Sequence, residues 1–369
     1  MNWIKPEYSK EQITAAGNVL INPASSQEQK EEAMKIMDNW RAAHGYPMHV
    51  FKIRLKSKAN EVNKNALTAQ RLKRVPAILY KLTKQYSGRK HAITLYDMQD
   101  IGGCRAIMPT VMETKRLYEQ YYNLKVNLKH RQVKTNDYIS KPKRDGYRSY
   151  HLVYEYYSDK KGKKIFNNGL LIELQFRSKL QHQWATAVEI AGFITKQAIK
   201  SNEGSEDWKE FFKLVSSAFA KNENLPIVPN TPNNEKELYL AIKKKEAELN
   251  VVHRLESWTR GINAMKNWDT KEGSKEKKNK RKQTQYFLLE LNVAEETASE
   301  LKIITYKMGE EKEAVEAYNN AEKKYHGQKQ YDVVLVGVDT AKELEKAYPN
   351  YFADTREFLK ELKKILNKY

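Results

Sequence analysis

Residues 170–177 read LLIELQFR, a short run in which apolar and polar side chains alternate. Because successive side chains of a β-strand point to opposite faces of a sheet, this alternation predicts a strand with one buried face. The buried face carries Ile172, Leu174 and Phe176, and the other face carries Glu173, Gln175 and Arg177. A carboxylate, an amide and a guanidinium in one row are more than a solvated sheet edge requires. We interpret this polar face as part of a functional site.

Other segments extend this strand into a sheet with helices around it. Residues 104–108 and 148–157 read as two more short strands, whereas helical segments are expected over 1–50, 59–86, 179–200 and 206–221. Pro76 falls inside the predicted 59–86 helix and implies a kink or two abutting helices. The arrangement predicts an α+β fold, a mixed β-sheet flanked by helices.

A polar stretch in the last third of the chain marks a domain boundary. Residues 271–283 (KEGSKEKKNKRKQ) contain almost no apolar side chain, which is typical of a linker. Beyond it, strands are predicted at 286–293 and 331–338, and helices at 312–325, 340–348 and 355–366. We expect a first domain over residues 1–270, a basic linker over 271–284, and a second, smaller α/β domain over 285–369.

Composition limits the class of protein. No apolar run approaches the roughly 20 residues that a membrane-spanning helix needs, and the N-terminus has no apolar signal region, so we expect a cytoplasmic protein with no membrane association. The formal net charge of +20 favours polyanionic partners such as nucleotides or RNA, although a lysine-rich solvated surface would give the same number. Cys104 is the one cysteine, so we expect no disulfide and no structural metal.

Two segments carry groups suited to phosphate and metal binding. Residues 71–81 (RLKRVPAILYK) are rich in cations, and on a helix such cations can form a stripe that grips phosphate oxygens. Asp100 stands at the mouth of a strand before Gly102 and Gly103, which suits a Mg²⁺ ligand with close backbone approach. Taken alone, the first segment fits a solvated basic helix face better than a binding site, and the second fits a simple turn entering a strand.

A third segment, residues 137–151 (DYISKPKRDGYRSYH), combines cations with an aromatic ring on a tight turn. A ring beside cationic groups is how proteins hold an unstacked base, and here Tyr147 follows Gly146. A basic hairpin loop is the alternative interpretation. On the strand that opened this section, Glu173 can complete a metal site or take a proton from an attacking hydroxyl.

Together these segments resemble the synthetase of the RelA/SpoT family over about residues 50–220. The matching positions are Arg71, Lys73, Ile78 and Lys81; Asp100 and Arg105; residues 145–151; and Glu173, Gln175 and Arg177. Ala77 stands where the family usually has serine. The family's hydrolase domain has a His-Asp signature, which this sequence lacks, and no Walker A pattern is present.

The resemblance implies a pyrophosphokinase that moves a diphosphate from ATP to a ribose 3′-hydroxyl. The implied ATP ligands are Arg71, Lys73, Lys81 and Arg105. The implied Mg²⁺ ligands are Asp100 and Glu173, which with Tyr147 form the catalytic set. The implied acceptor ligands are Tyr147, His151, Lys143, Arg148, Gln175 and Arg177. The remaining alternatives are a synthetase of free (p)ppGpp or (p)ppApp and an inactive RNA-binding module.

The opening residues MNWIKPEYS and the C-terminal unit resemble the fused toxin–antitoxin branch known as CapRel. That resemblance implies a bacterial or prophage-encoded enzyme that modifies the 3′ CCA end of tRNA and stops translation. It also implies a C-terminal domain similar to a zinc finger without its metal ligands, in which Tyr348 and Tyr351 occupy the adenine pocket. The expected release signal is a phage protein, with the major capsid protein as the leading candidate, and we expect a monomer. Because tyrosine is abundant here, with 23 residues, a Y-x-x-Y pattern also arises by chance.

Overall fold

The computed structural model of this chain describes residues 3–84, 93–123, 129–159, 167–195, 206–256, 285–292, 300–307, 310–325, 328, 331–338 and 355–369. The described helices are α1 (Lys10–Ile21), α2 (Gln27–Ala43), α3 (Gly45–Val62), α4 (Val75–Thr83), α5 (Val111–Tyr122), α6 (Lys179–Thr195), α7 (Glu206–Asn222), α8 (Glu235–Leu249), α10 (Glu311–Lys324) and α12 (Arg356–Leu366). The described strands are β1 (Leu67–Leu72), β2 (Gly102–Met108), β3 (Arg131–Asp137), β4 (Tyr150–Glu155), β5 (Leu171–Ser178), β6 (Gln285–Asn292), β7 (Glu300–Tyr306) and β8 (Tyr331–Val338).

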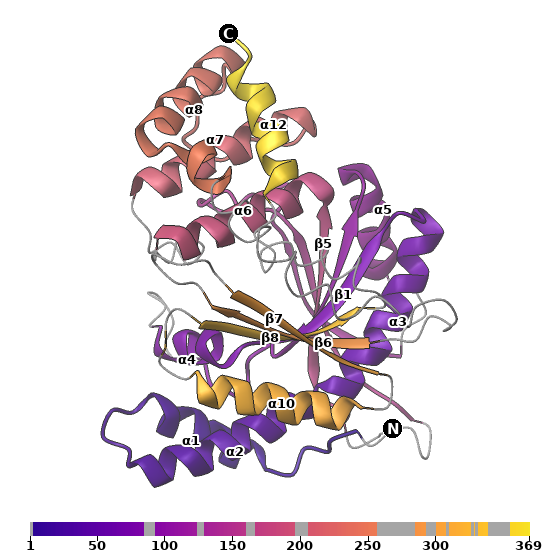
Figure 1. Cartoon of the computed structure of the whole chain (residues 1–369). Helices are drawn as coiled ribbons and strands as arrows, with labels where there is room; N and C mark the ends of the chain where they lie inside the picture. Colours follow the sequence, from indigo (N-terminus) through magenta and orange to yellow (C-terminus); the bar gives the residue numbers. More distant parts are fainter. Residues whose placement is uncertain are drawn as a thin grey trace, which may run out of the picture.

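The described strands form one mixed sheet in the order β3-β4-β5-β2-β1-β8-β6-β7. Strands β2 and β5 run parallel, with Gly103 opposite Glu173 and Arg105 opposite Gln175, and the other pairs run antiparallel. Figure 1 shows helices on both sides of this sheet. The predicted α+β class, with a mixed sheet flanked by helices, is confirmed.

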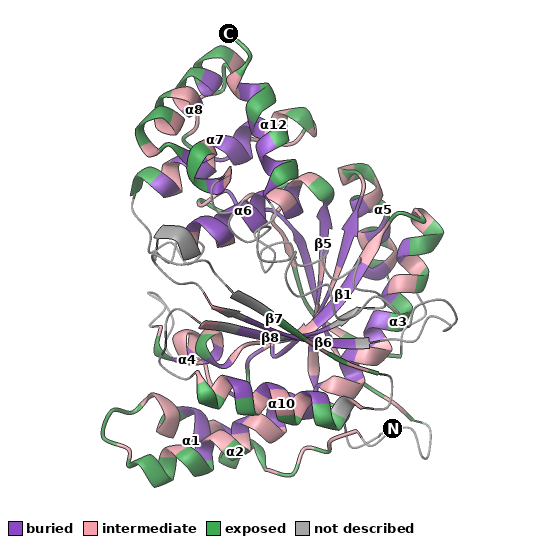
Figure 2. Cartoon of the chain, viewed as in Figure 1, coloured by how far each residue is buried: buried purple, intermediate pink, exposed green. Residues whose placement is uncertain are grey.

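Most of the helices lie around the sheet in three groups, and α10 packs separately on β6 and β8 (Figure 1). Helices α3 and α5 pack on β2, β4 and β5 in one apolar core, and α1, α2 and α4 share a second core. Helices α6, α7, α8 and α12 form a third, which we call the helical lobe. Figure 2 shows buried residues along the strands and on the inner sides of these helices. Among the described helices, none is long and apolar enough to cross a membrane.

The single helix predicted over 59–86 is wrong. The segment contains the end of α3, then β1, then α4. Asn63 ends α3 in an extended conformation, and the sequence LTAQRL then alternates as a strand does. Pro76 lies in the first turn of α4, where a missing N–H costs nothing, so the proline starts a helix instead of kinking one. Arg71 therefore lies on a strand, and Lys73 follows that strand directly.

The C-terminal segment meets the rest of the chain in two places. Strand β8 pairs with β1 at Gln70–Gly337 and Arg71–Val336, so β6, β7 and β8 continue the main sheet. Helix α12 instead joins the helical lobe, where Phe358 is buried. The predicted strands and the predicted 355–366 helix are present in this segment. The predicted linker and the predicted 340–348 helix lie outside the described residues, and the domain boundaries remain a prediction.

Candidate active site

A cavity of about 250 Å³ lies between the sheet and the helical lobe. Its lining combines cations with aromatic rings: Arg71, Lys73, Arg105, Lys143, Asp145, Tyr147, His151, Gln175, Arg177, Trp184, Ala185, Val188, Lys209 and Phe212. Eight of these residues were predicted from the sequence as ligands of ATP or of the acceptor. Strands β1, β2 and β5 supply the three arginines, and the helical lobe supplies Lys209 and most of the apolar wall.

Asp100 lies at the edge of this cavity between two lysines. The Nζ atoms of Lys73 and Lys81 each lie 2.8 Å from one of its carboxylate oxygens. Lys73 is held by its own N–H, which donates to the Ile101 carbonyl at 2.8 Å, and Lys81 comes from the last turn of α4. Burial favours the neutral carboxyl, but the two ammonium groups outweigh it and lower the pKa of Asp100. Asp100 is therefore a carboxylate at neutral pH.

Glu173 is fixed by hydrogen bonds to both of its oxygens. His151 Nδ1 lies 2.8 Å from Oε1, and Gln175 Nε2 donates to Oε2 at 2.6 Å. These contacts follow from register, because His151 lies opposite Gln175 where β4 pairs with β5. Burial alone would raise the pKa of Glu173, but the neighbouring His151 lowers it below its ordinary value. The carboxylate is thus charged and has one orientation.

Tyr147 connects this carboxylate to the cations of the cavity. Its hydroxyl lies 2.9 Å from His151 Nε2 and also contacts Arg177. The ring lies 4.9 Å from the Arg177 guanidinium and 5.0 Å from Lys143 Nζ. Burial favours the neutral phenol, yet Arg177 and His151 outweigh it and lower the pKa of Tyr147. One ring therefore sits among three groups that bind anions or bases.

The turn that presents Tyr147 depends on Gly146. Its φ of +93° lies in the left-handed region that side chains rarely adopt. A Cβ atom there would lie 2.8 Å from the Cβ of Ser216 and 3.1 Å from the ring of Trp184. The sequence Gly146-Tyr147 thus places the ring against the helical lobe as only glycine allows.

Most of the residues that form this cavity belong to a segment that is similar to a known protein family. Residues 70–195 match the model of a region found in RelA/SpoT proteins, which falls inside the range of 50–220 given by the motifs. The chain carries a RelA/SpoT domain. The prediction of a pyrophosphate-transferring enzyme is thereby confirmed. No curated protein sequence matches the chain.

Several solved structures are similar to this chain. Small alarmone synthetase 1 from Bacillus subtilis is 23% identical, the match covering 50% of this chain and 90% of that one, with a TM-score of 0.39. A GTP pyrophosphokinase family protein from Streptococcus pneumoniae is 21% identical, the match covering 54% of this chain and 91% of that one, also with a TM-score of 0.39.

The carboxylates of the RelA/SpoT domain fit a magnesium ion. Both side chains have lowered pKa values, and each contacts a residue that lines the cavity. Mg²⁺ prefers oxygen ligands and is usually held by one or two carboxylates plus water and substrate phosphates. No group of three or more His, Cys, Asp or Glu suited to a metal occurs in the described ranges, so these two carboxylates would share the ion with phosphate oxygens. The bound ion would neutralise charge on the transferred phosphates.

Asp100 and Glu173 contact residues that line the cavity, whereas Arg148 lies apart from it. Arg148 does not line the cavity of the RelA/SpoT domain. It is 4% exposed, and its guanidinium donates to Ser216 Oγ and to the carbonyls of Ile139 and Pro226. Its role as an acceptor ligand is a prediction that this placement does not support. Tyr348 and Tyr351 lie outside the described residues.

The sequence interpretation missed the contribution of α7. Lys209 and Phe212 of this helix line the cavity, and the indole of Trp184 donates to the Phe212 carbonyl at 2.8 Å. Lys209 also pairs with Glu206, whose side chain is exposed. No motif marks these residues, because they approach the strands only through tertiary packing. The one available signal was the apolar face of α7, which predicts burial and no site.

Arg148→Ala will destabilise the protein by about 2–4 kcal/mol, since removing the guanidinium leaves the buried Ile139 carbonyl and the buried Ser216 hydroxyl without this donor. The free energy of unfolding in urea measures this, with the exposed Arg144→Ala as the matched control. If Arg148→Ala unfolds like wild type and only binds the acceptor more weakly, the interior role is wrong.

Proposed function

We propose that this enzyme transfers the diphosphate of ATP to the 3′-hydroxyl of the terminal adenosine of tRNA, and that this blocks translation. The observation that carries the proposal is the pair of carboxylates beside a cavity lined by cations and by Tyr147. Phosphoryl transfer depends mainly on positioning and on charge neutralisation, so it needs no covalent nucleophile from the protein.

The donor binds on the side of β1 and β2. Arg71, Lys73 and Arg105 line this part of the cavity, and guanidinium groups bind phosphate oxygens with two parallel hydrogen bonds. Lys81 reaches the same region through Asp100. The triphosphate of ATP carries the opposite charge to this wall, which therefore attracts it.

The acceptor binds between Tyr147 and Glu173. The acceptor base stacks on the ring of Tyr147, in the way that RNA-binding proteins stack bases on aromatic rings flanked by cations. His151 and Gln175 lie beside the ribose. The 3′-oxygen attacks the β-phosphorus of ATP, the bond to the oxygen bridging the α- and β-phosphates breaks, and AMP leaves. The hydroxyl proton passes to Glu173, which the hydrogen bonds from His151 and Gln175 hold in one orientation.

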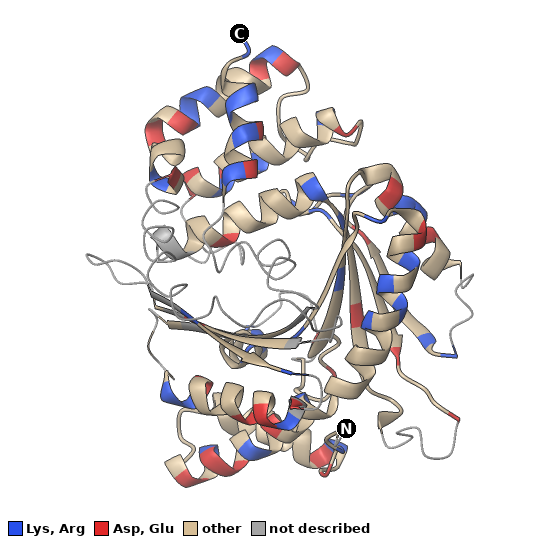
Figure 3. Cartoon of the chain, turned by 45° about the vertical axis from the view of Figure 1, so that its right-hand side comes forward, with Lys and Arg blue, Asp and Glu red and all other residues tan. Residues whose placement is uncertain are grey.

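The charge of the chain favours tRNA over a free nucleotide. A net charge of +20 attracts a long polyanion far more strongly than a single nucleotide, because each phosphate contact releases counterions. On the described helices of Figure 3, acidic and basic residues are mixed. The alternative function is synthesis of (p)ppGpp or (p)ppApp from free nucleotides.

Autoinhibition by residues 339–354 is part of this proposal. The segment joins β8 to α12 and contains Tyr348 and Tyr351. Its first anchor, β8, pairs with Arg71, which lines the cavity. Its second anchor, α12, places Phe358 6.1 Å from the ring of Phe212, which lines the opposite wall. A chain tied to both walls has a short route to the ATP site. A phage protein, with the major capsid protein as our candidate, would bind the open form and release the block.

The test is an assay with labelled ATP, deacylated tRNA and GTP offered together. We expect label on the 3′ end of tRNA, and more of it in Tyr351→Ala than in wild type. The phage capsid protein should raise wild-type transfer and leave Tyr351→Ala unchanged. Label on guanosine nucleotides alone would refute the tRNA acceptor and favour the alternative, while the pyrophosphokinase assignment would stand.

A further inference from the structure

Arg41 of α2 is a guanidinium enclosed between α2, α10 and the turn from β1 to α4. It is 1% exposed. Its Nη2 lies 2.9 Å from the Glu322 carboxylate of α10, its Nη1 donates to Asp38 at 3.3 Å, and its Cζ lies 4.9 Å from the Tyr318 ring. A buried charge is tolerated where it is paired, and removing its partner leaves it uncompensated. Helix α10 is therefore bound to α2 by a specific charge pair, and Figure 1 shows the two helices side by side.

The two residues of this charge pair also contact the segment that carries the phosphate-binding lysines. Nε of Arg41 donates to the Lys73 carbonyl at 3.2 Å. The other oxygen of Glu322 accepts the N–H of Val75, the first residue of α4, at 2.9 Å. The first N–H groups of a helix have no acceptor within the helix, and the N-cap residue Arg74 carries no acceptor on its side chain. Glu322 thus caps α4 from 247 positions away in the sequence.

These contacts bear on Asp100 through the two lysines that hold it. Lys73 has its backbone fixed by Arg41, and Lys81 lies on the helix that Glu322 caps. Both ammonium groups meet one carboxylate, at 2.8 Å each. We infer that Glu322 is a positioning residue for the phosphate-binding side of the ATP site. This role rests on the proposed ATP-dependent reaction.

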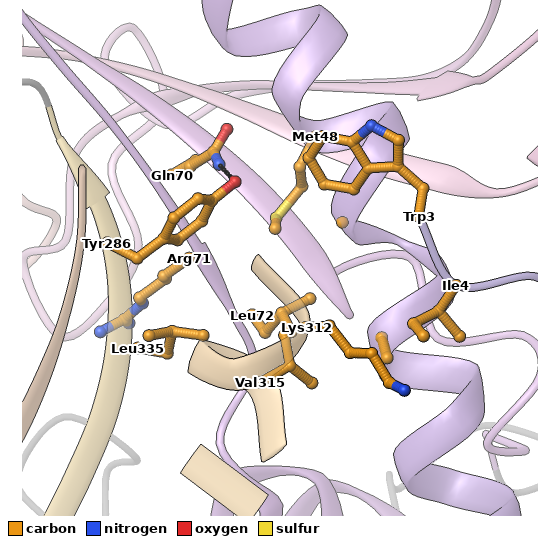
Figure 4. Close-up of a pocket in the computed structure, with 12 residues that line it drawn as sticks. Trp3, Ile4, Met48, Gln70, Arg71, Leu72, Tyr286, Lys312, Val315 and Leu335 are labelled. Atoms are coloured by element: carbon orange, nitrogen blue, oxygen red, sulfur yellow. Dashed lines mark hydrogen bonds between the residues drawn. The ribbon is translucent and has the colours of Figure 1, made fainter. Parts of the chain in front are cut away.

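The opposite end of α10 has no comparable polar anchor to the sheet among its described residues. Figure 4 shows an apolar pocket there, with Val315 and Lys312 of α10 facing Trp3 and Met48. Apolar contacts are non-directional, so they hold α10 against the sheet without fixing its position along it. A paired guanidinium and carboxylate in a fixed geometry do fix it. The Glu322 end therefore sets where α10 sits relative to α4.

Hydrogen exchange and nucleotide binding test the inference in the full chain. We expect Glu322→Gln to speed amide exchange of residues 73–83 at least tenfold, with exchange in β4 and β5 unchanged. In the Tyr351→Ala background it should weaken binding of a non-hydrolysable ATP analogue at least tenfold. Tyr318→Phe removes only one hydroxyl donor to Glu322, so it should shift both quantities in the same direction by a smaller factor and keep the fold.

Glu316→Gln is the matched control, because Glu316 lies on the same helix with its side chain 63% exposed. It should leave both quantities unchanged. Two results would overturn the inference. In the first, amide exchange of residues 73–83 in both Glu322→Gln and Tyr318→Phe stays within twofold of that in Glu316→Gln. In the second, exchange in β4 and β5 rises as much as exchange of residues 73–83. Neither measurement involves an acceptor. Both can therefore still be interpreted if the tRNA assay gives no transfer to tRNA.

Discussion

Glu173→Gln will lower diphosphate transfer by roughly 1,000-fold, within the range that a general base contributes. The amide keeps the shape of the carboxylate and its contact with Gln175, but it can neither accept the proton of the attacking hydroxyl nor share a magnesium ion. His151 also loses the charged partner 2.8 Å away. The measurement is the initial rate of label transfer from ATP, in the full chain and in the Tyr351→Ala chain.

Glu155→Gln is the control for this substitution. Glu155 ends the neighbouring strand β4 and pairs with the exposed Arg131, away from the cavity. Its loss should leave the rate within twofold, because exposed ion pairs contribute little. Transfer by Glu173→Gln above a tenth of the Glu155→Gln rate would contradict a role for Glu173 in the reaction.

Tyr351→Ala will raise the transfer rate of the full chain by about 100-fold. If the closed form outnumbers the open form by 99 to 1, complete release increases the competent fraction by that factor. Aromatic rings bind guanidinium groups through cation–π contact, so removing one ring weakens the closed state directly. The measurement is label transfer to tRNA without any phage protein. Cells that produce this variant should also stop growing.

Tyr369→Ala is the matched control, because Tyr369 is an exposed tyrosine of the same C-terminal segment, at 64% exposure. Its rate should equal that of wild type. A Tyr351→Ala protein that stays as inactive as Tyr369→Ala, while Glu173-dependent transfer appears on adding capsid protein, would place the inhibitory contact elsewhere in the chain.

The sequence predicts the residues at the centre of this site better than the residues that hold them in place. The strand at 171–178 was recognised because strict alternation leaves a single assignment of faces, and register then brought Gln175 opposite His151. The short strand β1 was missed because the cations around Arg71 and the apolar residues of α4 also fit a helix period. Strand β3 was missed because it is an exposed edge strand without an apolar face.

Contacts between distant segments account for the remaining differences. Arg148 falls inside a motif whose Asp145, Tyr147 and His151 line the cavity, yet its own side chain points into the interior. Lys209 and Glu322 carry no local signal, because each acquires its role only when α7 or α10 packs against residues far away in the chain. Periodicity describes one element at a time and cannot show which elements meet.

The attachment of residues 339–354 at both ends has a consequence for how strong the inhibitory contact must be. A group tethered close to its site acts at an effective concentration of the order of millimolar. In the autoinhibition that we propose, β8 and α12 anchor the segment, and its tyrosine pair would compete with ATP without needing high affinity of its own. The same sequence supplied as a free peptide at micromolar concentration would therefore fail to inhibit the Tyr351→Ala enzyme. A partner that lifts the block has to overcome the free energy that separates the closed form from the open form, and that free energy includes the contribution of the tether.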